Sequence, residues 1–492
     1  MALARTTSDW FVAAPSTAKG WEERARLIRS SLLHEDWLAA LAPAFGAGTV
    51  ASDRLERAAA SGFVVTAGQQ PGLFGGPLYT WWKAFTALAV ADRLQELTGL
   101  PVAPVFWAAT DDSDFAESAL TAVATAEGAE RIEMPEPPGV GIALARVELG
   151  DVSAQLQQMG RATGSASDSA VLDIVRNAYR HDATIGGAYI RLLRSTLEPL
   201  GVSVLDAAHE SVRKSAHTLL VQALEKSEAI DAALSERSRS LKDAGFSAQV
   251  NVIDGRSLVF SEADGKRERI KVRDAADRAR SAASGSLGPN VLLRPIVERS
   301  ILPTVAYLGG PAEIAYFAQV TAVSSVLEVP APVVLPRWSG YVVEPRIDRI
   351  LARHSLTVEE FRDPHAVETR LARESFPEGV ARGIENLRLE LAKSLAEIDQ
   401  AEGADLVPAA VLEGLRRNVE HRIARLERRL SAGIKRRGND SLRDAAIARG
   451  ALFPFGVPQE RSLNFMPLLA RYGDNLMAGV MQEIRAHAAR IT

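Results

Sequence analysis

Apolar runs alternate with helix-like segments in the first third of the chain. An apolar run at residues 63–66 leads into a glycine-rich loop at residues 67–77, and a helix is expected to begin at Pro77. A second apolar run, residues 102–108, ends in an acidic loop at residues 110–114. Strands that alternate with helices are typical of parallel sheets, which bind ligands beyond the carboxyl ends of their strands. The pattern therefore predicts an α/β core with polar loops at one edge.

The strand pattern returns much later in the chain. Residues 302–308 form an apolar run that ends in Gly309-Gly310-Pro311 and a helix, and residues 332–335 form a strand that ends near Arg337. The sequence Gly-Gly-Pro thus recurs, since Gly75-Gly76-Pro77 also precedes a helix. We expect the two helix N-termini to face one crevice of a parallel sheet.

The region between these strands has a different pattern of apolar and polar residues. Residues 151–245 are mostly helix-periodic, whereas residues 247–272 alternate apolar and polar positions. Asp254-Gly255, between residues 249–252 and 257–260, predicts a hairpin turn in a small antiparallel meander. We interpret the helical and small β segments from about residue 135 to 290 as inserted in the sheet domain.

From residue 377 the chain is rich in Arg, Glu, Leu and Ala. Apolar side chains recur there at three- and four-residue spacings, which predicts an antiparallel coiled-coil hairpin at residues 377–447. The stripes are Ile384, Leu387, Leu391, Leu395 and Ile398, then Val419, Ile423, Leu426, Leu430 and Ile434, with Gly403-Ala404-Asp405 between them. Residues 448–492 are expected to return to the core domain, residues 1–376, because prolines interrupt residues 453–461.

Composition narrows the function classes. The 492 residues are 47% hydrophobic and 24% charged, and they include no cysteine, which excludes disulfides, thiolate metal sites and a cysteine nucleophile. The net charge of −4 gives no reason to expect a nucleic-acid partner. The longest apolar stretches are interrupted by Lys83 and Glu313, and residues 1–20 contain no continuous apolar segment. We therefore expect a cytoplasmic protein without membrane spans.

The glycine loops are the first candidate site. Gly68, Gly75, Gly76, Gly309 and Gly310 precede helices, where backbone amides suit an anion or a nucleotide cofactor. Their spacing fits neither the dinucleotide fingerprint nor a Walker loop, because Lys83 lacks the Gly-Lys-Ser/Thr context. Plain chain reversal explains such a turn about as often as a ligand cradle does, so both interpretations stay open.

Several segments together resemble the bacillithiol biosynthesis cysteine-adding enzyme family. The matching residues are 66–70, 76–80 with Lys83, 104–107, 293–295, 302–311 with Glu313, Tyr316 and Gln319, and 453–461. The resemblance covers nearly the whole chain. It implies a Rossmann-like core related to nucleotidyltransferases, a coiled-coil domain that forms a homodimer, and a ligase that joins L-cysteine to the amino group of glucosaminyl-malate.

One position departs from the family pattern. The family usually has a histidine in the acidic run that follows the Phe-Trp strand, whereas this chain has Asp111-Asp112-Ser113-Asp114. Serine does not titrate near neutral pH, so Ser113 removes a candidate general base or imidazole ligand. A histidine at this place would have to come from elsewhere in the fold, with His181 and His209 nearest in sequence.

The resemblance and the residue chemistry suggest roles for the charged candidates. Lys83 is expected to hold a phosphate or a malate carboxylate, and Arg294 and Arg337 to clamp the two malate carboxylates. Asp112 and Asp114 are expected to bind Mg²⁺, to recognise an ammonium group or to accept a proton from the attacking amine. A capped turn is the alternative for the aspartates, and structural ion pairs are the alternative for the arginines.

The other candidates are polar and aromatic residues of the same motifs. Gln69 and Gln70 suit sugar hydroxyl groups. Glu313 is a candidate for substrate binding, and the alternative is that its charge only stabilises the dipole of the second Gly-Gly-Pro helix. The candidate pocket residues are Tyr79, Trp107, Tyr307, Tyr316 and Gln319, with core packing as the alternative for Trp107, Tyr307 and Tyr316, and Gln459, Glu460 and Arg461 are candidates for a closing loop.

Amide formation from a free carboxylate is uphill in water, so ATP and Mg²⁺ are the expected cofactors, although no sequence motif identifies metal ligands. Two other functions stay open. One is a related nucleotidyl- or aminoacyl-transfer enzyme with a different amine acceptor, which the Ser113 departure favours. The other is a dimeric protein that binds metabolites without turnover.

Overall fold

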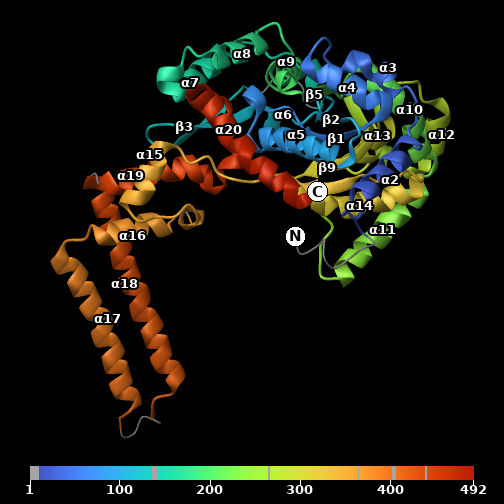
Figure 1. Ribbon diagram of the computed structural model, residues 1–492. Coiled ribbons are helices and arrows are strands. Elements are labelled where there is room, and N and C mark those ends of the chain that lie inside the picture. The colour runs from blue at the N-terminus through green and yellow to red at the C-terminus, as the bar shows by residue number, and fades with distance from the viewer. Residues whose placement is uncertain (1–9, 136–140, 264–265, 364, 402–405, 438–439) are drawn as a thin grey trace. The chain divides into compact units, whose positions relative to one another are not determined.

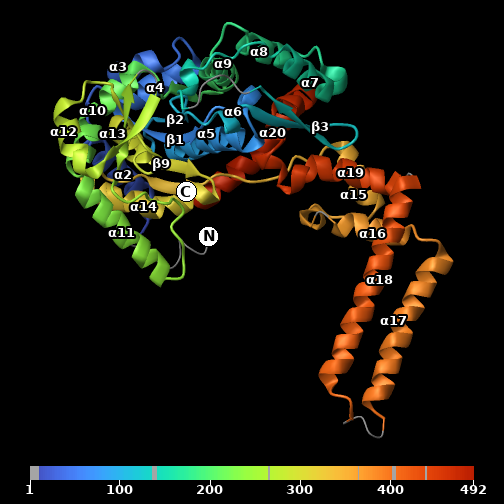
Figure 2. The same cartoon turned by 180° about the vertical axis from the view of Figure 1, so that it is seen from behind.

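A computed structural model describes residues 10–135, 141–263, 266–363, 365–401, 406–437 and 440–492 (Figures 1 and 2). The chain divides into two compact units. Unit 1 comprises Met1–Val123, Arg131–Gly340 and Leu463–Thr492, and unit 2 comprises Ala124–Glu130 and Tyr341–Ser462. The division after Gly340 differs from the boundary expected at residue 376.

Unit 1 is built on a five-stranded parallel sheet with the order β10-β9-β1-β2-β5. The strands are β1 (Phe63–Gln69), β2 (Val102–Ala108), β5 (Ser203–Asp206), β9 (Thr304–Gly309) and β10 (Val333–Pro336). The chain leaves β1 towards β2 and β5, and later returns on the other side of β1 with β9 and β10. The strand order therefore reverses between β1 and β9, which is the place where open α/β sheets bind ligands. The predicted Rossmann-like α/β fold is confirmed.

Helices bury both faces of the sheet, which explains the continuous apolar strands. On one face, α5 (Leu78–Thr98) packs against β1, β2 and β9, and α20 (Met466–Ile491) packs against α5 (Figures 1 and 2). On the other face, α3 (Trp37–Leu41) and α10 (Glu210–Glu225) share a core with the sheet residues Val64, Val105 and Leu205.

The chain contains further helices and a two-stranded sheet. The helices are α2 (Ala18–Arg29), α4 (Val50–Ser61), α6 (Phe115–Ser118), α7 (Ser153–Thr163), α8 (Ala170–Ala178), α9 (Ile185–Leu197), α11 (Ser227–Asp243), α12 (Ala275–Ser281), α13 (Arg294–Ile301) and α14 (Pro311–Leu327). The strands β3 (Leu120–Ala124) and β4 (Ala129–Glu133) form a two-stranded sheet. In the part of the chain that the structure describes, no helix combines the length and the apolar character needed to cross a bilayer.

The predicted insertion needs one correction. β5 lies within residues 135–290, yet it pairs with β2 along Val105–Ala108 and belongs to the main sheet. The strand has only four residues and lies between helix-periodic segments, so it is too short to be recognised from its sequence pattern.

The small antiparallel meander exists, and the predicted strand at residues 257–260 lies within β6, but the predicted strand at residues 249–252 is absent. It consists of β6 (Arg256–Ala263), β7 (Lys266–Lys271) and β8 (Leu287–Pro289) in the order β7-β6-β8. Residues 249–252 are not a strand, because both backbone groups of Val250 bond to the Gln319 side chain. Asp254-Gly255 therefore precedes β6 rather than joining two strands.

The two Gly-Gly-Pro segments start their helices differently. Pro311 is the first residue of α14, whereas Pro77 is the N-cap of α5 with extended backbone angles. The expectation that α5 begins at Pro77 is thus one residue early.

Unit 2 contains the predicted coiled-coil hairpin. Its helices α17 (Glu378–Asp399) and α18 (Ala409–Arg437) pack against each other (Figure 1). Apolar packing is concentrated where Phe376, Ile384 and Ile423 are buried together. Other helices of the unit are α15 (Pro345–Arg353), α16 (Ala366–Glu374) and α19 (Asp440–Leu452). The predicted turn at Gly403-Ala404-Asp405 and the side chain of Ile434 lie outside the described residues.

Only part of the predicted stripe is buried. Leu387, Ile398 and Leu426 are 55%, 41% and 43% exposed. A buried carboxylate, Glu427, lies near the packed end and accepts hydrogen bonds from Arg373 at 2.6 Å and Arg388 at 3.0 Å. The hairpin therefore combines a short apolar core and a buried ion triad with an exposed apolar face.

Candidate active site at the switch point

The candidate site lies where β1 and β9 end, at the reversal of strand order. Gly68 and Gln69 end β1, and Gly309 ends β9. Helix α5 contributes Lys83, and α14 contributes Glu313. Two Gly-Gly-Pro segments distant in sequence thus place their helices around one point of the sheet, as the sequence pattern predicts.

Lys83 joins the two sides of this point. Its side chain is 4% exposed, and Nζ pairs with Glu313 Oε2 at 2.6 Å. Nζ also donates to Gly68 O at 2.9 Å and to Gln69 Oε1 at 2.8 Å. An ammonium group has three N–H donors, so these acceptors use all of them. Burial lowers the pKa of Lys83, and the charge of Glu313 opposes that effect.

Glu313 has a structural role as well as a charge. Its Oε2 accepts the N–H of Gly310 at 2.8 Å, and its Oε1 accepts the hydroxyl of Tyr307 at 2.7 Å. Burial raises the pKa of Glu313, but Lys83 and these hydrogen bonds outweigh burial and hold the pKa below its usual value. Glu313 therefore caps α14 and remains ionised opposite Lys83.

Arg294 and Glu298 form a second buried pair behind the first. Arg294 Nη2 donates to the hydroxyls of Tyr307 at 3.2 Å and Tyr316 at 3.3 Å, and Nη1 donates to Glu298 Oε2 at 3.3 Å. Glu298 is 1% exposed, and burial raises its pKa to about 7. Glu298 is not among the predicted site residues, although its position four residues after Arg294 on a helix indicates an ion pair.

Tyr79 continues the hydrogen-bond chain towards solvent. Its hydroxyl accepts Gln69 Nε2 at 3.2 Å and donates to Glu117 Oε1 at 3.3 Å. Burial, and then the charge of Asp114, raise the pKa of the Glu117 carboxyl. Glu117 lies on α6 and is not among the predicted site residues; the residue as a whole is exposed, but its carboxyl group is partly shielded from water. A carboxylate thus ends a chain that starts at Lys83.

The aspartates of the acidic loop are largely engaged within the loop. Asp112 Oδ1 accepts the N–H groups of Ser113 at 2.6 Å and Asp114 at 3.2 Å, and its Oδ2 accepts Gln70 Nε2. Asp114 is the N-cap of α6 and accepts the N–H of Glu117 at 3.1 Å. The capped turn, which the sequence left as the alternative, is the arrangement observed. Among the described residues, no group of three or more acidic or histidine side chains is arranged to hold a metal ion.

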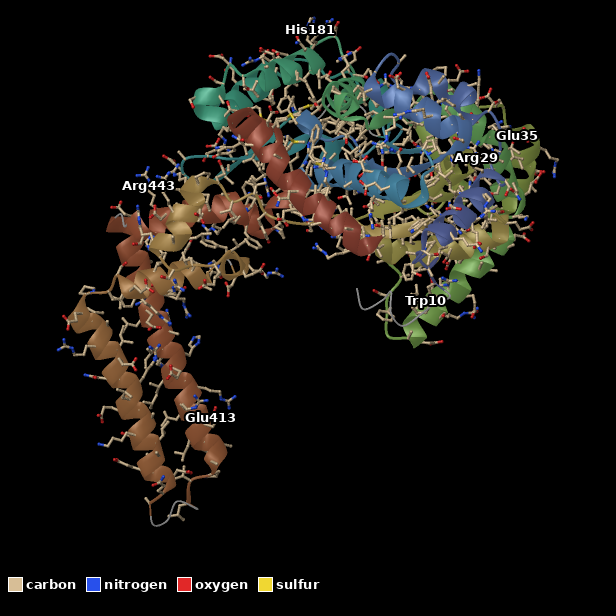
Figure 3. All side chains as sticks on the ribbon, in the orientation of Figure 1. Trp10, Arg29, Glu35, His181, Glu413 and Arg443 are labelled. Carbon is tan, nitrogen blue, oxygen red and sulfur yellow. The ribbon has the colours of Figure 1, made fainter. Side chains whose placement is uncertain are left out.

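Neither candidate histidine takes the place of Ser113. His209 is the N-cap of α10, and its ring accepts the N–H of Ser211. His181 is exposed on the loop before α9 (Figure 3). Within the described part of the chain, neither ring forms a hydrogen bond to the acidic loop.

Arg267 of β7 holds the start of the acidic loop. Its Nη1 donates to Asp111 O at 3.1 Å, its Nη2 lies 3.5 Å from Asp111 Oδ2, and its Nε lies 3.3 Å from Glu262 Oε1. Burial raises the pKa of Asp111, and Arg267 counteracts that rise. No sequence motif identifies Arg267, because its partner Asp111 is more than 150 residues away in the chain.

The glycine loop before α5 is bonded to itself and to two distant side chains. The N–H of Gly75 points to Gly72 O and the Tyr179 hydroxyl, and the N–H of Gly76 donates to Leu73 O. Asn464 Nδ2 donates to the carbonyls of residues 73, 74 and 76. These glycines, predicted to bind a cofactor, use their amides inside the turn and thereby fix the start of α5.

The remaining candidates have separate environments. Arg337 is buried, donates to Trp338 O at 2.8 Å and lies 5.7 Å from the centre of the Tyr79 ring. Trp107 is packed in the core with Trp37, and Gln319 is bonded to Val250.

Gln459 and Arg461 belong to unit 2. The Gln459 amide bonds to both backbone groups of Val342 and to Ala451 O, so it has a structural role inside that unit. Arg461 is exposed at the end of a short helix, Gln459–Arg461.

Side chains of both charges are grouped at the switch point. The positive charges of Arg294 and Arg337 both act on Lys83, so three cations lie in one region. Glu313 pairs with Lys83 and Glu298 pairs with Arg294, while Lys83 also acts on Glu117 and Arg294 acts on Asp111. The cations of such a region can attract carboxylates or phosphates, and its carboxylates can attract an ammonium group.

Comparisons with known proteins agree with this architecture. The family model described as "Bacillithiol biosynthesis BshC, N-terminal Rossmann-like domain" matches residues 8–338, and the model of the C-terminal coiled-coil domain of the same family matches residues 340–492. A protein of Solibacter usitatus named "Putative cysteine ligase BshC" is 32% identical over 91% of this chain and 87% of its own length. Proteins of the same name from Koribacter versatilis and Salinibacter ruber are 31% and 28% identical, over 88% and 86% of this chain and 84% and 80% of their own lengths.

Proposed function

The chain belongs to the bacillithiol biosynthesis BshC family, and on this premise we propose that it joins L-cysteine to the amino group of glucosaminyl-malate. The names of the relatives support a cysteine ligase. The observation that carries the substrate assignment is the cluster of Lys83, Arg294 and Arg337 at the reversal of strand order. This cluster suits a substrate with two carboxylates, such as a malate glycoside.

Arg294 and Arg337 are the proposed partners of the malate carboxylates. A guanidinium group has five N–H donors, and Glu298, Tyr307 and Tyr316 use three of those of Arg294. The Nε–H group and one N–H group of Nη1 form no hydrogen bond with the described residues, and either suits a carboxylate oxygen. Lys83 holds Gly68, Gln69 and Glu313 in place and does not itself bind the substrate, because all three of its N–H donors are used within the protein.

Glu117 is the proposed partner of the acceptor amine. Its raised pKa favours proton uptake when the amine attacks, and Tyr79 connects it to Gln69 and Lys83. Asp112, which the sequence favoured, has its oxygen atoms occupied by Gln70 and two backbone amides.

ATP and Mg²⁺ are proposed from reaction chemistry. Joining a carboxylate to an amine releases water and is uphill, so the cysteine carboxyl group must first be converted to a better leaving group. Because the described residues offer no ready group of three ligands, Mg²⁺ would arrive with the phosphates of ATP and take at most one or two carboxylates. We also propose a cytoplasmic homodimer formed through the hairpin of α17 and α18.

The test is product detection by mass spectrometry after incubation with L-cysteine and glucosaminyl-malate, with and without ATP and Mg²⁺. We expect an amide product that requires ATP and is reduced at least tenfold in Arg337→Gln. The matched control is Arg180→Gln, which changes an exposed arginine paired with Asp182 and is expected to retain activity.

A different outcome would favour the other functions. Product with another amine, but none with glucosaminyl-malate, would indicate that the Ser113 departure changed the acceptor. Binding of both substrates without any product under all conditions would indicate a metabolite-binding protein.

A further inference from the structure

Two arginines of unit 1 lie within electrostatic range of each other, near the end of β9 opposite to the candidate active site. Arg299 lies in the last turn of α13, just before β9, and has no exposed surface. Arg24 is a half-buried residue of α2, and α2 packs against β9. The neighbouring Arg29 of α2 is labelled in Figure 3.

Arg299 has unused donors although it is completely buried. Its Nη2 donates to Ile28 O at 3.0 Å and to the hydroxyl of Ser31. Its Nε and Nη1 have no hydrogen-bond partner among the described residues. Buried N–H groups of a charged side chain are costly when they have no acceptor.

Arg24 adds a second positive charge to this region. Its Nη2 donates to Ala331 O, while its buried Nε also has no partner among the described residues. Burial and then the charge of Arg24 lower the pKa of Arg299 to about 9. In the parts of the chain that the structure describes, neither arginine forms an ion pair with a carboxylate.

Two half-buried arginines of unit 1 have different surroundings. Arg29 donates to the carbonyls of Ala58, Ala59 and Gly62, and Arg54 lies 2.9 Å from Asp92. Arg54 Nη2 also has no hydrogen-bond partner among the described residues, but Arg54 has a carboxylate beside it. Among the described residues, Arg24 and Arg299 have orphan donors and no carboxylate partner.

We propose that Arg299 and Arg24 bind a small inorganic anion of the size of chloride between α2 and α13. The Nε–H and Nη1–H groups of a guanidinium point in different directions, so the anion accepts from one of these two orphan donors of Arg299, a side chain with no exposed surface. The anion compensates the two charges and stabilises the packing of α2 on the sheet. Because the site is at the other end of α13 from Arg294, it acts on stability and not on the reaction.

The test is bromide replacement in crystals of the full chain. Anomalous scattering is expected to show one bromide within hydrogen-bond distance of Arg299 Nε or Nη1. Water molecules alone at these donors, with no bromide signal, would overturn the proposal.

A second measurement is made in solution and does not depend on crystals. At constant ionic strength, replacing sodium gluconate with sodium chloride is expected to raise the Tm by about 1–3 °C. The rise should disappear in Arg299→Gln, or in Arg24→Gln if the first variant does not fold. It should persist in the control Arg29→Gln, whose arginine is bonded to carbonyls. An equal Tm in both salts would contradict the proposal.

Discussion

Lys83 is a buried side chain whose charge is compensated by its surroundings. Three acceptors, Gly68 O, Gln69 Oε1 and Glu313 Oε2, surround its Nζ within 3 Å. Removing one partner of such a group leaves the other buried without compensation, which costs more than the pair itself contributes. The residue therefore joins β1 to α14 at the point where the site is formed.

Lys83→Met is expected to destabilise unit 1 by about 3–5 kcal/mol, because Glu313 remains buried without its cation. All seven tryptophans lie between Trp10 and Trp338, so tryptophan fluorescence in urea reports on this unit. The double variant Lys83→Met/Glu313→Gln should recover part of the loss. A single-variant effect below about 1 kcal/mol would contradict the buried-pair argument.

Glu298 predicts a pH dependence of stability. Its pKa is about 7 in the folded protein and about 4.5 in the unfolded chain, so the folded state binds the extra proton between these values. This stabilisation is complete below pH 4.5 and is lost as the pH rises through 7.

The unfolding free energy of the wild type relative to Glu298→Gln is therefore expected to fall by on the order of 3 kcal/mol between pH 4.5 and 8. Urea unfolding over this pH range measures it. Glu210→Gln is the control, because the hydrogen bond to Lys214 lowers the pKa of the exposed Glu210 and gives the opposite trend. A difference that does not change with pH would show that Glu298 is ionised throughout.

At the scale of elements, the glycine loop determines where α5 begins. Gly75 has a φ of 90°, a conformation that favours glycine. A Cβ atom at this position would lie 2.6 Å from Trp81 Cζ2 and 3.1 Å from Leu192 Cδ2. Both the backbone conformation and the packing therefore require glycine.

Gly75→Ala is expected to destabilise unit 1 by more than about 2 kcal/mol, through strain and a clash with α5. Gly99→Ala is the matched control, since Gly99 also has a positive φ but a Cβ atom there would meet nothing within 4 Å. The control isolates backbone strain, which costs about 1 kcal/mol. Equal effects in urea unfolding would mean that the contact with Trp81 is unimportant.

The sequence predicts elements whose own apolar residues recur over many positions. It does not predict short elements whose structure depends on hydrogen bonds to residues far away in the chain. The strands β1, β2 and β9 and the helices of the hairpin follow from the spacing of their own apolar residues. β5 has four residues, and Val250 leaves the strand pattern because Gln319, 69 positions away, binds its backbone. Local patterns cannot reveal such long-range hydrogen bonds.

The same limit applies to the candidate site. Lys83, Arg294 and Glu313 belong to recognisable motifs, and the structure brings them together. Glu117 and Arg267 are identified only by contacts that the fold creates. Gly75 and Gly76 have the composition of a ligand loop, but Asn464 and Tyr179 show that their neighbourhood is bonded internally.

At the scale of the whole molecule, the exposed face of the hairpin predicts self-association. Leu387 and Leu415 are 55% and 48% exposed, and exposed apolar residues at coiled-coil spacing commonly pack against another helix. Leu387→Glu combined with Leu415→Glu is expected to halve the mass measured by light scattering after gel filtration. Lys393→Glu, a charge change at another exposed position of α17, is the control. A wild-type monomer, or a double variant that remains dimeric, would contradict this interface.

The position of Asn464 late in the chain determines when the loop before α5 can be completed during synthesis. Its side chain binds the carbonyls of the loop that positions α5, and it follows Gly76 by 388 residues. At about 5–20 residues per second, the ribosome needs roughly 20–80 s to reach it after making the loop. Until then the nascent chain contains both Gly-Gly-Pro segments but lacks the amide that holds the first loop. A premature stop shortly before Asn464 would thus leave nearly all candidate site residues in place and still yield a protein without a formed site.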